Sequence, residues 1–130
     1  MKASLDPKVW WLRAQKDLRS AQLNFDEDSA GQAEVICYDC QQACEKMLKA
    51  FLLKNGWTLM KTHDLDYLLQ EAIKYLSEIS RFEAQISELN TLFMPSHYPF
   101  DYADPIGDAE ARKSLELAKA IRDLLQPSIY

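Results

Sequence analysis

The chain has 130 residues, of which 48% are hydrophobic and only three are glycine, and its formal net charge is −5. This length fits one domain over residues 1–130, and the composition disfavours both a disordered chain and extended β structure. No stretch approaches the length of a membrane span, and the N-terminus lacks the apolar segment of a signal peptide, so we expect a cytoplasmic protein without membrane contact. The negative charge argues against broad electrostatic binding to nucleic acid but leaves room for a local basic site.

The first half of the chain has helical periodicity with readable boundaries. Asp6 followed by Pro7 is an N-cap and a first helical position, so a first helix is predicted to begin there. A second helix is predicted to open with a capping box at Ser29 and to run to about Lys54, where an Asn-Gly pair ending at Gly56 stops it.

The second half continues the helical pattern with one long interruption. A third helix is predicted to begin near Asp64, and a fourth to follow a second capping box at Ser80. The last is predicted to start near Asp108 and to end at Pro127, after an irregular stretch over residues 94–107. About five amphipathic helices without a strand pattern predict an all-α fold, an up-and-down antiparallel bundle.

Three cysteines close together in the second helix, Cys37, Cys40 and Cys44, invite comparison with a metal site. At 100° per residue, however, all three lie near the middle of a broad apolar arc. Structural zinc normally takes four ligands, and the two histidines, His63 and His97, lie downstream without the spacing of paired ligands. We therefore predict that the cysteines are core residues and that the protein binds no metal and no cofactor.

The polar side chains of the second helix form a narrow stripe opposite the cysteines, made by Gln42, Glu45, Lys46 and Lys49. In a mostly buried helix such a stripe is normally solvated or turned toward a second subunit. Glu45 and Lys49 have the spacing of an exposed ion pair, which stabilises a helix by only about 0.2–0.5 kcal/mol. His63, near the start of the third helix, is interpreted as a capping or packing residue, with a role as a ligand as the alternative.

The irregular stretch contains the sequence PSHYPFDYADP over residues 95–105. A connection of this length is unusual in a bundle of this size. One interpretation is a packed loop whose aromatic residues cover the end of the bundle. The other is functional, with His97, Tyr98 and Tyr102 facing a ligand or a second subunit.

Four pieces of the sequence together resemble the HEPN domain family of small helical-bundle proteins. They are Trp-Leu-x-Ala-x-x-Asp-Leu-x-x-Ala at 11–21, CQQACEKMLKA at 40–50, Thr-His-Asp-Leu at 62–65, and Tyr-Pro at 98–99 before an Ala/Leu-rich last helix. The resemblance covers nearly the whole chain and is fairly specific as a set, although each single piece would be weak.

The resemblance implies a homodimer, and many prokaryotic members pair with a minimal nucleotidyltransferase as a toxin–antitoxin system. Active members are ribonucleases with an Arg-x4–6-His motif whose two copies meet across the dimer. In relatives with an Arg-Tyr-Pro loop, the positions of that pair match His97 and Tyr102 here. The spacing is kept, but both residue types differ.

This difference bears on catalysis. Arginine offers a permanent charge and a bidentate fork for phosphate. His97 can act as a base, an acid or a part-time cation, whereas Tyr102, with an ordinary pKa of about 10, is a poor base near neutral pH. Nucleotide or RNA binding without rapid cleavage is therefore our first interpretation, with His97 and Tyr102 as the catalytic candidates if cleavage occurs.

Two alternatives stay open: a metal-independent ribonuclease toxin that uses His97, and a protein-interaction module without a nucleotide site. The residues expected to bind a nucleotide are Gln42, Lys46, Lys49, His97, Tyr98 and Tyr102.

Overall fold

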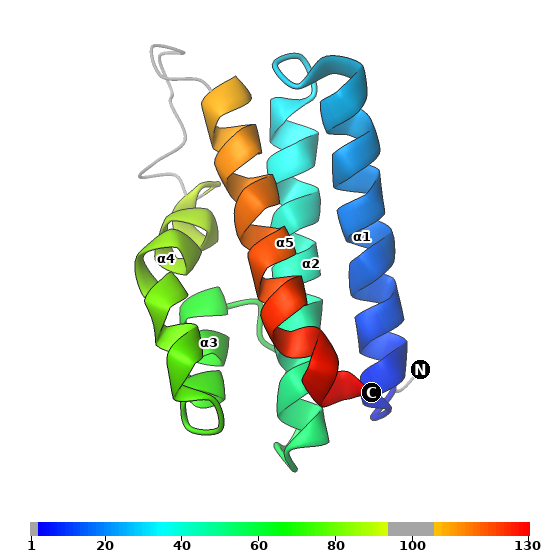
Figure 1. The fold of residues 1–130 in the computed structure, drawn as a ribbon, viewed down its shortest axis with the longest axis vertical. Helices are drawn as coiled ribbons and strands as arrows, with labels where there is room; N and C mark the ends of the chain where they lie inside the picture. The colour runs from blue at the N-terminus through cyan, green and yellow to red at the C-terminus, as the bar shows by residue number, and fades with distance from the viewer. Residues whose placement is uncertain (1–2, 94–105) are drawn as a thin grey trace.

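The computed structural model describes residues 3–93 and 106–130. Three helices of 22 residues each, α1 (Pro7–Asp28), α2 (Ala33–Lys54) and α5 (Asp108–Ile129), stand side by side (Figure 1). Shorter elements cover one side of α2 and α5: α3 (Leu65–Ile73), the 3₁₀ helix η1 (Ser77–Phe82) and α4 (Glu83–Thr91). Because the described ranges hold helices and no strand, the predicted all-α bundle is confirmed.

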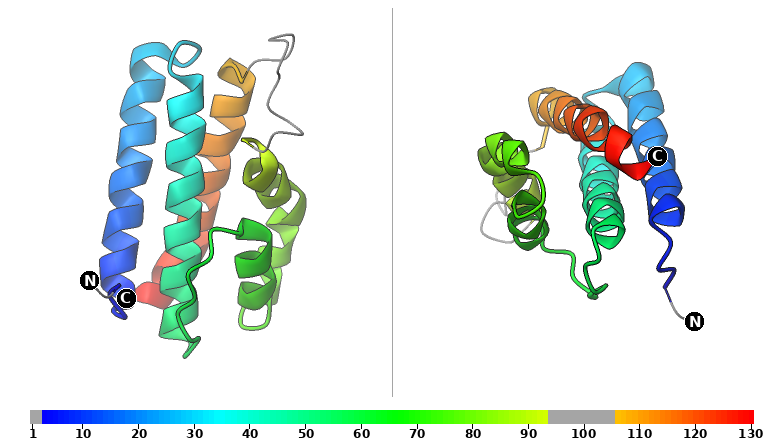
Figure 2. Two further views of the ribbon diagram at one scale, coloured as in Figure 1. Left: turned by 180° about the vertical axis from the view of Figure 1, so that it is seen from behind. Right: turned by 60° about the horizontal axis from the view of Figure 1, so that its bottom comes forward.

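Helix α2 is the centre of the bundle, since it packs against α1, α3, α4 and α5 (Figure 2). Its cysteines, Cys37, Cys40 and Cys44, are fully buried, which confirms their prediction as core residues. Burial raises the pKa of the Cys40 thiol far above its usual range and that of Cys44 to about 12. Thiols held protonated in this way are poor nucleophiles at neutral pH.

The described ranges contain neither a metal site nor a helix that could span a membrane. They contain no group of three or more His, Cys, Asp or Glu side chains arranged to hold a metal ion. Within the same ranges, no helix combines the length and the apolar character that crossing a membrane requires.

Several helix boundaries follow from the local signals in the sequence. Asp6 caps α1 by accepting a hydrogen bond of 2.9 Å from the backbone N–H of Lys8. Asp64 caps α3 in the same way through the N–H groups of Asp66 and Tyr67. Gly56, just past α2, has a φ of 87°, a left-handed conformation that glycine adopts without strain. These three predictions are confirmed.

Both predicted capping boxes are wrong. Ser29 has helical backbone angles at the C-terminal end of α1, and its hydroxyl donates a hydrogen bond to Asp108 instead of capping α2. Ser80 lies inside η1, and α4 begins at Glu83 without a side-chain cap. For Ser29 a distant contact replaces the local pairing that the sequence pattern indicates, and for Ser80 a local 3₁₀ helix does so.

The last helix also runs further than predicted, because Pro127 lies inside α5 and does not end it. Proline has the φ angle of a helix, but inside a helix it removes one backbone hydrogen bond and its ring crowds the carbonyl four residues earlier. Ile129, two residues later, is fully buried, so packing of the final turn offsets that loss.

The environment of Cys40 gives a test of the cysteine core. Replacing Cys40 by serine puts a hydroxyl among apolar neighbours, and we expect a loss of about 1–3 kcal/mol in the free energy of unfolding. Cys37→Ser is the matched control, since the Ser114 hydroxyl already lies 3.5 Å from the Cys37 sulfur and would offer the new hydroxyl a partner. Urea denaturation with and without a chelator measures both effects. Equal losses in the two variants, or unfolding of the native chain by the chelator, would contradict the interpretation.

Candidate functional site

The polar stripe of α2 does not form one solvated surface. Gln42 and Lys46 are partly exposed, whereas the side chains of Glu45 and Lys49 are only 5% and 4% exposed. The stripe is therefore divided into an accessible pair and a buried pair, which have different chemical uses.

The buried pair is an ion pair supported from two sides. Lys49 Nζ lies 3.0 Å from Glu45 Oε2, and His63 Nδ1 lies 2.9 Å from Glu45 Oε1. Lys49 Nζ also lies 5.2 Å from the ring centroid of Trp10, a favourable cation–π distance. The predicted pairing of Glu45 with Lys49 is correct, but its predicted exposure is wrong, because Trp10 of α1 and the segment before α3 meet the pair.

His63 contacts the Glu45 carboxylate from the solvent-exposed side. Its side chain is 84% exposed, although one ring nitrogen contacts the buried Glu45 carboxylate. The histidine therefore joins the buried charge to the surface. The predicted capping or packing role of His63 is not what the structure shows, because Asp64 caps α3 and the exposed His63 ring makes a polar contact with Glu45 instead.

Lys46 forms an ion pair of a different kind. Its Nζ lies 2.6 Å from Asp17 Oδ2 of α1, and both side chains keep about a quarter of their surface exposed. Burial raises the pKa of the neighbouring Asp39 carboxyl, although Ser20 donates a hydrogen bond of 2.8 Å to it. A phosphate that reaches Lys46 would thus have to replace the Asp17 carboxylate in an electrostatically acidic neighbourhood.

A cleft of about 540 Å³ opens beside the accessible end of this stripe. Its walls come from α2, from the segment before α3, and from α3 and α4. The lining is polar and consists of Gln41, Gln42, Glu45, His63, Asp64, Asp66, Asn90 and Thr91.

Asn90 fixes the geometry on the α3 side of the cleft. Its Oδ1 accepts a hydrogen bond of 2.9 Å from the Leu65 N–H, while its Nδ2 donates to Asp64 and Asp66 at 3.0 and 3.1 Å. Gln41 Nε2 ties α2 to α4 by donating to the Leu89 carbonyl at 3.0 Å. These contacts hold the cleft walls without a ligand.

Gln42 differs in its hydrogen bonding from the other two side-chain amides of the cleft, Gln41 and Asn90. Its amide forms no hydrogen bond with any residue of the described ranges, so it offers a ligand both a donor and an acceptor. The sequence indicated Gln42 but not Asn90, because Asn90 lies 26 residues from Asp64 and no local pattern joins them.

The structure distributes the predicted nucleotide-binding residues unevenly. Gln42 lines the cleft, Lys46 lies one turn further along α2, and Lys49 is buried with Glu45. The other candidates, His97, Tyr98 and Tyr102, lie outside the described residues.

Comparisons with known proteins identify a family. The sequence model of the HEPN domain matches residues 7–127. Among solved structures, ST0689, described as an archaeal HEPN homologue, is similar with a TM-score of 0.74 and 23% sequence identity, and the match covers 100% of both chains. At this identity the likeness shows the fold alone. A search of curated proteins gave no significant match.

The buried ion pair yields a prediction about stability. Glu45→Gln removes the carboxylate and leaves the Lys49 charge buried without a counterion, so we expect the free energy of unfolding to fall by about 3–5 kcal/mol. The control is Glu78→Gln, whose partner Arg81 lies 3.5 Å away with both side chains 56% exposed, and a much smaller change is expected there. Urea denaturation measures both variants. Similar small losses would show that the Lys49 charge does not depend on Glu45.

Proposed function

Because this chain belongs to the HEPN domain family, a nucleotide-binding and ribonuclease-type fold, we propose that it binds a nucleotide or RNA in the cleft beside Gln42. The observation that carries this proposal is an open cleft lined by polar residues. Hydrogen bonds of Gln41 and Asn90 connect its walls, and the Gln42 amide has no hydrogen-bond partner among the described residues. Because every residue that lines the cleft is polar or charged, hydrogen bonds would hold the ligand there.

The chemistry of the lining decides how the nucleotide lies. The carboxylates of Asp64 and Asp66 accept hydrogen bonds from sugar hydroxyls or base amino groups, but they repel phosphate. In this proposal the nucleoside part therefore enters the cleft and contacts Gln42. The phosphate then remains at the rim, on the side of α2 that carries Lys46.

The two lysines differ in what they can offer to that phosphate. Lys46 and Asp17 each keep about a quarter of their side-chain surface exposed, so water can reach both groups and Lys46 can exchange its carboxylate for a phosphate at a lower cost than Lys49 can. Lys49 cannot do so without leaving Glu45 buried and unpaired. We therefore assign Lys46 to phosphate binding and give Lys49 the role of holding Glu45 in place.

The proposal also includes His97, Tyr98 and Tyr102. An aromatic ring of Tyr98 or Tyr102 would stack on a base, and His97 would approach the phosphate. Because His97 and Tyr102 stand where active relatives of this type carry arginine and histidine, we expect binding with little or no cleavage. A homodimer acting beside a minimal nucleotidyltransferase in a toxin–antitoxin system is the setting we propose on the basis of the family.

Titration of a labelled RNA oligonucleotide and of a nucleotide tests the site. We expect binding that weakens with added salt, and Lys46→Ala should weaken it by about 5–10-fold, which corresponds to about 1–1.4 kcal/mol. Gln42→Ala should weaken binding without changing its salt dependence, because the amide carries no charge. Lys113→Ala on α5, which removes an exposed lysine outside this cleft, is the matched control and should have little effect.

Cleavage is measured in the same samples, with His97→Ala as a further variant. Rapid metal-independent cleavage that His97→Ala abolishes would favour the ribonuclease alternative. Binding that survives Lys46→Ala combined with His97→Ala would contradict the proposed site and leave the interaction module as the better interpretation.

A further inference from the structure

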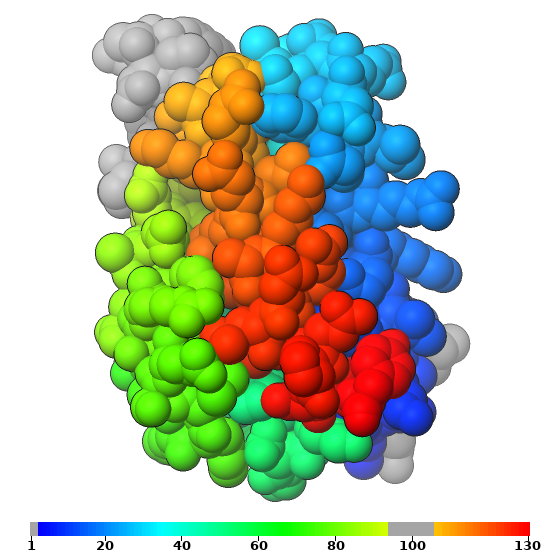
Figure 3. Space-filling model, in the orientation of Figure 1, coloured from blue at the N-terminus to red at the C-terminus, as the bar shows by residue number. Residues whose placement is uncertain are grey.

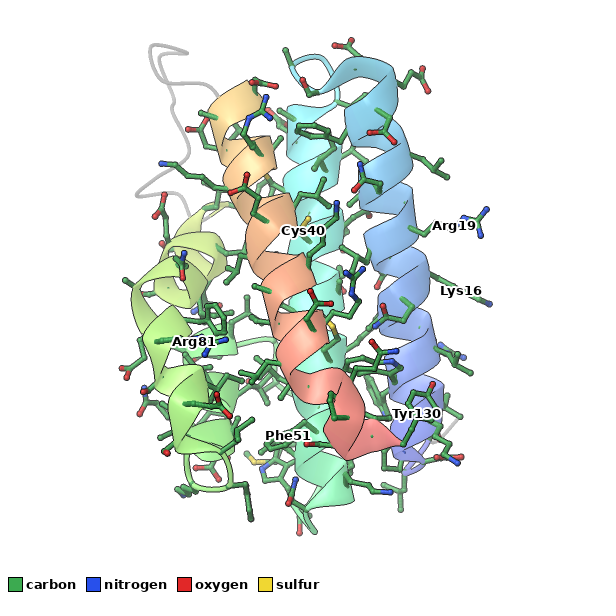
Figure 4. The ribbon with its side chains drawn as sticks, viewed as in Figure 1. Lys16, Arg19, Cys40, Phe51, Arg81 and Tyr130 are labelled. Carbon is green, nitrogen blue, oxygen red and sulfur yellow. The ribbon has the colours of Figure 1, made fainter. Side chains whose placement is uncertain are left out.

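The outer side of α1 carries a surface that the proposed nucleotide site does not use. Leu12 and Leu23 are 56% and 59% exposed, and Lys16 and Arg19 lie between them, also exposed. Figure 4 shows Lys16 and Arg19 pointing from α1 away from the bundle. We call these four residues the leucine–cation face.

The spacing of the four residues makes them one stripe. They stand at i, i+4, i+7 and i+11, so they follow one side of the helix with a leucine at each end and two cations between. A shallow hollow of about 400 Å³ lies along the stripe, lined by Lys16, Arg19, Ser20, Leu23 and Asn24. In the space-filling view, side chains of α1 stand out from the edge of the molecule (Figure 3).

Neither cation of this stripe has an ion-pair partner in the described ranges, a property that they share with Arg13 of α1 and Lys113 of α5. The arginines outside α1, which are Arg81, Arg112 and Arg122, each contact a carboxylate. By contrast, Lys16 and Arg19 have no ion pair with any residue in the described ranges, although the chain as a whole carries an excess of acidic residues. The leucine–cation face therefore presents two cations with a leucine at each end, while the carboxylates of Asp17 and Asp39 lie on the side of α1 that meets α2.

A second copy of the same surface is a poor occupant. A two-fold axis through the middle of the stripe would place Lys16 against Arg19 of the partner subunit and bring four positive charges together. RNA would neutralise the cations but would leave both leucines without apolar contacts. A helix that carries apolar and acidic residues satisfies all four positions at once.

We propose that the leucine–cation face docks an acidic amphipathic helix of another protein. Two carboxylates of that helix would meet Lys16 and Arg19, and apolar side chains would cover Leu12 and Leu23. The interaction is independent of the nucleotide proposal, because α1 packs against α2 and α5 (Figure 2), while the residues that line the cleft come from α2, α3, α4 and the segment before α3.

The stripe defines the probe for a test. Its spacing of four, three and four residues reads the same in both directions, so a helical peptide with Leu-x3-Glu-x2-Glu-x3-Leu is complementary in either orientation. The acidic peptide carries a fluorescent label, and a second peptide carries lysine in place of both glutamates. Fluorescence anisotropy then measures the binding of each peptide to the full chain.

We expect the acidic peptide to bind the native chain saturably and the lysine peptide not to bind. The double variant Lys16→Glu with Arg19→Glu should lose at least about 10-fold in affinity for the acidic peptide and gain affinity for the lysine peptide, since like and opposite charges exchange roles. Leu12→Ser with Leu23→Ser should also weaken binding, and Lys113→Glu on α5 should not. All substituted positions are exposed, so circular dichroism should show an unchanged helix content.

Three outcomes would overturn the proposal. The first is the absence of saturable binding of the acidic peptide, and the second is equal binding of that peptide by the charge-reversed variant. The third is a loss of RNA affinity in that variant with no effect on the peptide, which would make the surface a contact for nucleic acid.

Discussion

The rest of the structure depends on the burial of α2 on nearly all sides. A helix with neighbours on each side has few positions at which a polar side chain can reach water, and every other polar group needs a partner inside the protein. Glu45 and Lys49 illustrate this constraint, because each is buried and each satisfies the other. Trp10 of α1 adds a cation–π contact to Lys49, and His63, before α3, adds a polar contact to Glu45.

The same constraint separates structural charges from those available for binding. A charge can be used by a ligand only if its present partner can be released to water at small cost. Lys46 meets this condition because it and Asp17 remain partly exposed. Lys49 does not, since release of Lys49 would leave a carboxylate buried and uncompensated. Two lysines three residues apart on one helix thus have different roles, and burial decides between them.

The sequence predicted features that arise within a few residues of one another. The caps at Asp6 and Asp64, the glycine stop after α2 and the apolar arc that holds the cysteines are all local, and the structure confirms them. One of the failures involves a distant partner. Ser29 was predicted as a cap, but Asp108, 79 residues away, takes its hydroxyl.

The candidate site follows the same division. Gln42 and Lys46 could be identified because helical periodicity placed them on the polar side of α2. The network of Asn90 and the burial of Glu45 could not, because both result from how α3, α4 and α1 pack against α2. Distant packing leaves no signal in a single sequence, and here that packing determines which charges remain accessible.

The positions of the two proposed binding surfaces have an energetic consequence. The cleft and the leucine–cation face share no lining residue, and α2 lies between them. Binding free energies at sites without shared partners normally add. An acidic helix on α1 would nevertheless bring negative charge toward the Lys46 and Asp17 pair, which belongs to the α1–α2 contact. Any effect of that helix on phosphate binding should therefore be electrostatic, and added salt should remove it, because salt screens exposed charges over about 8–10 Å at 0.10–0.15 M ionic strength.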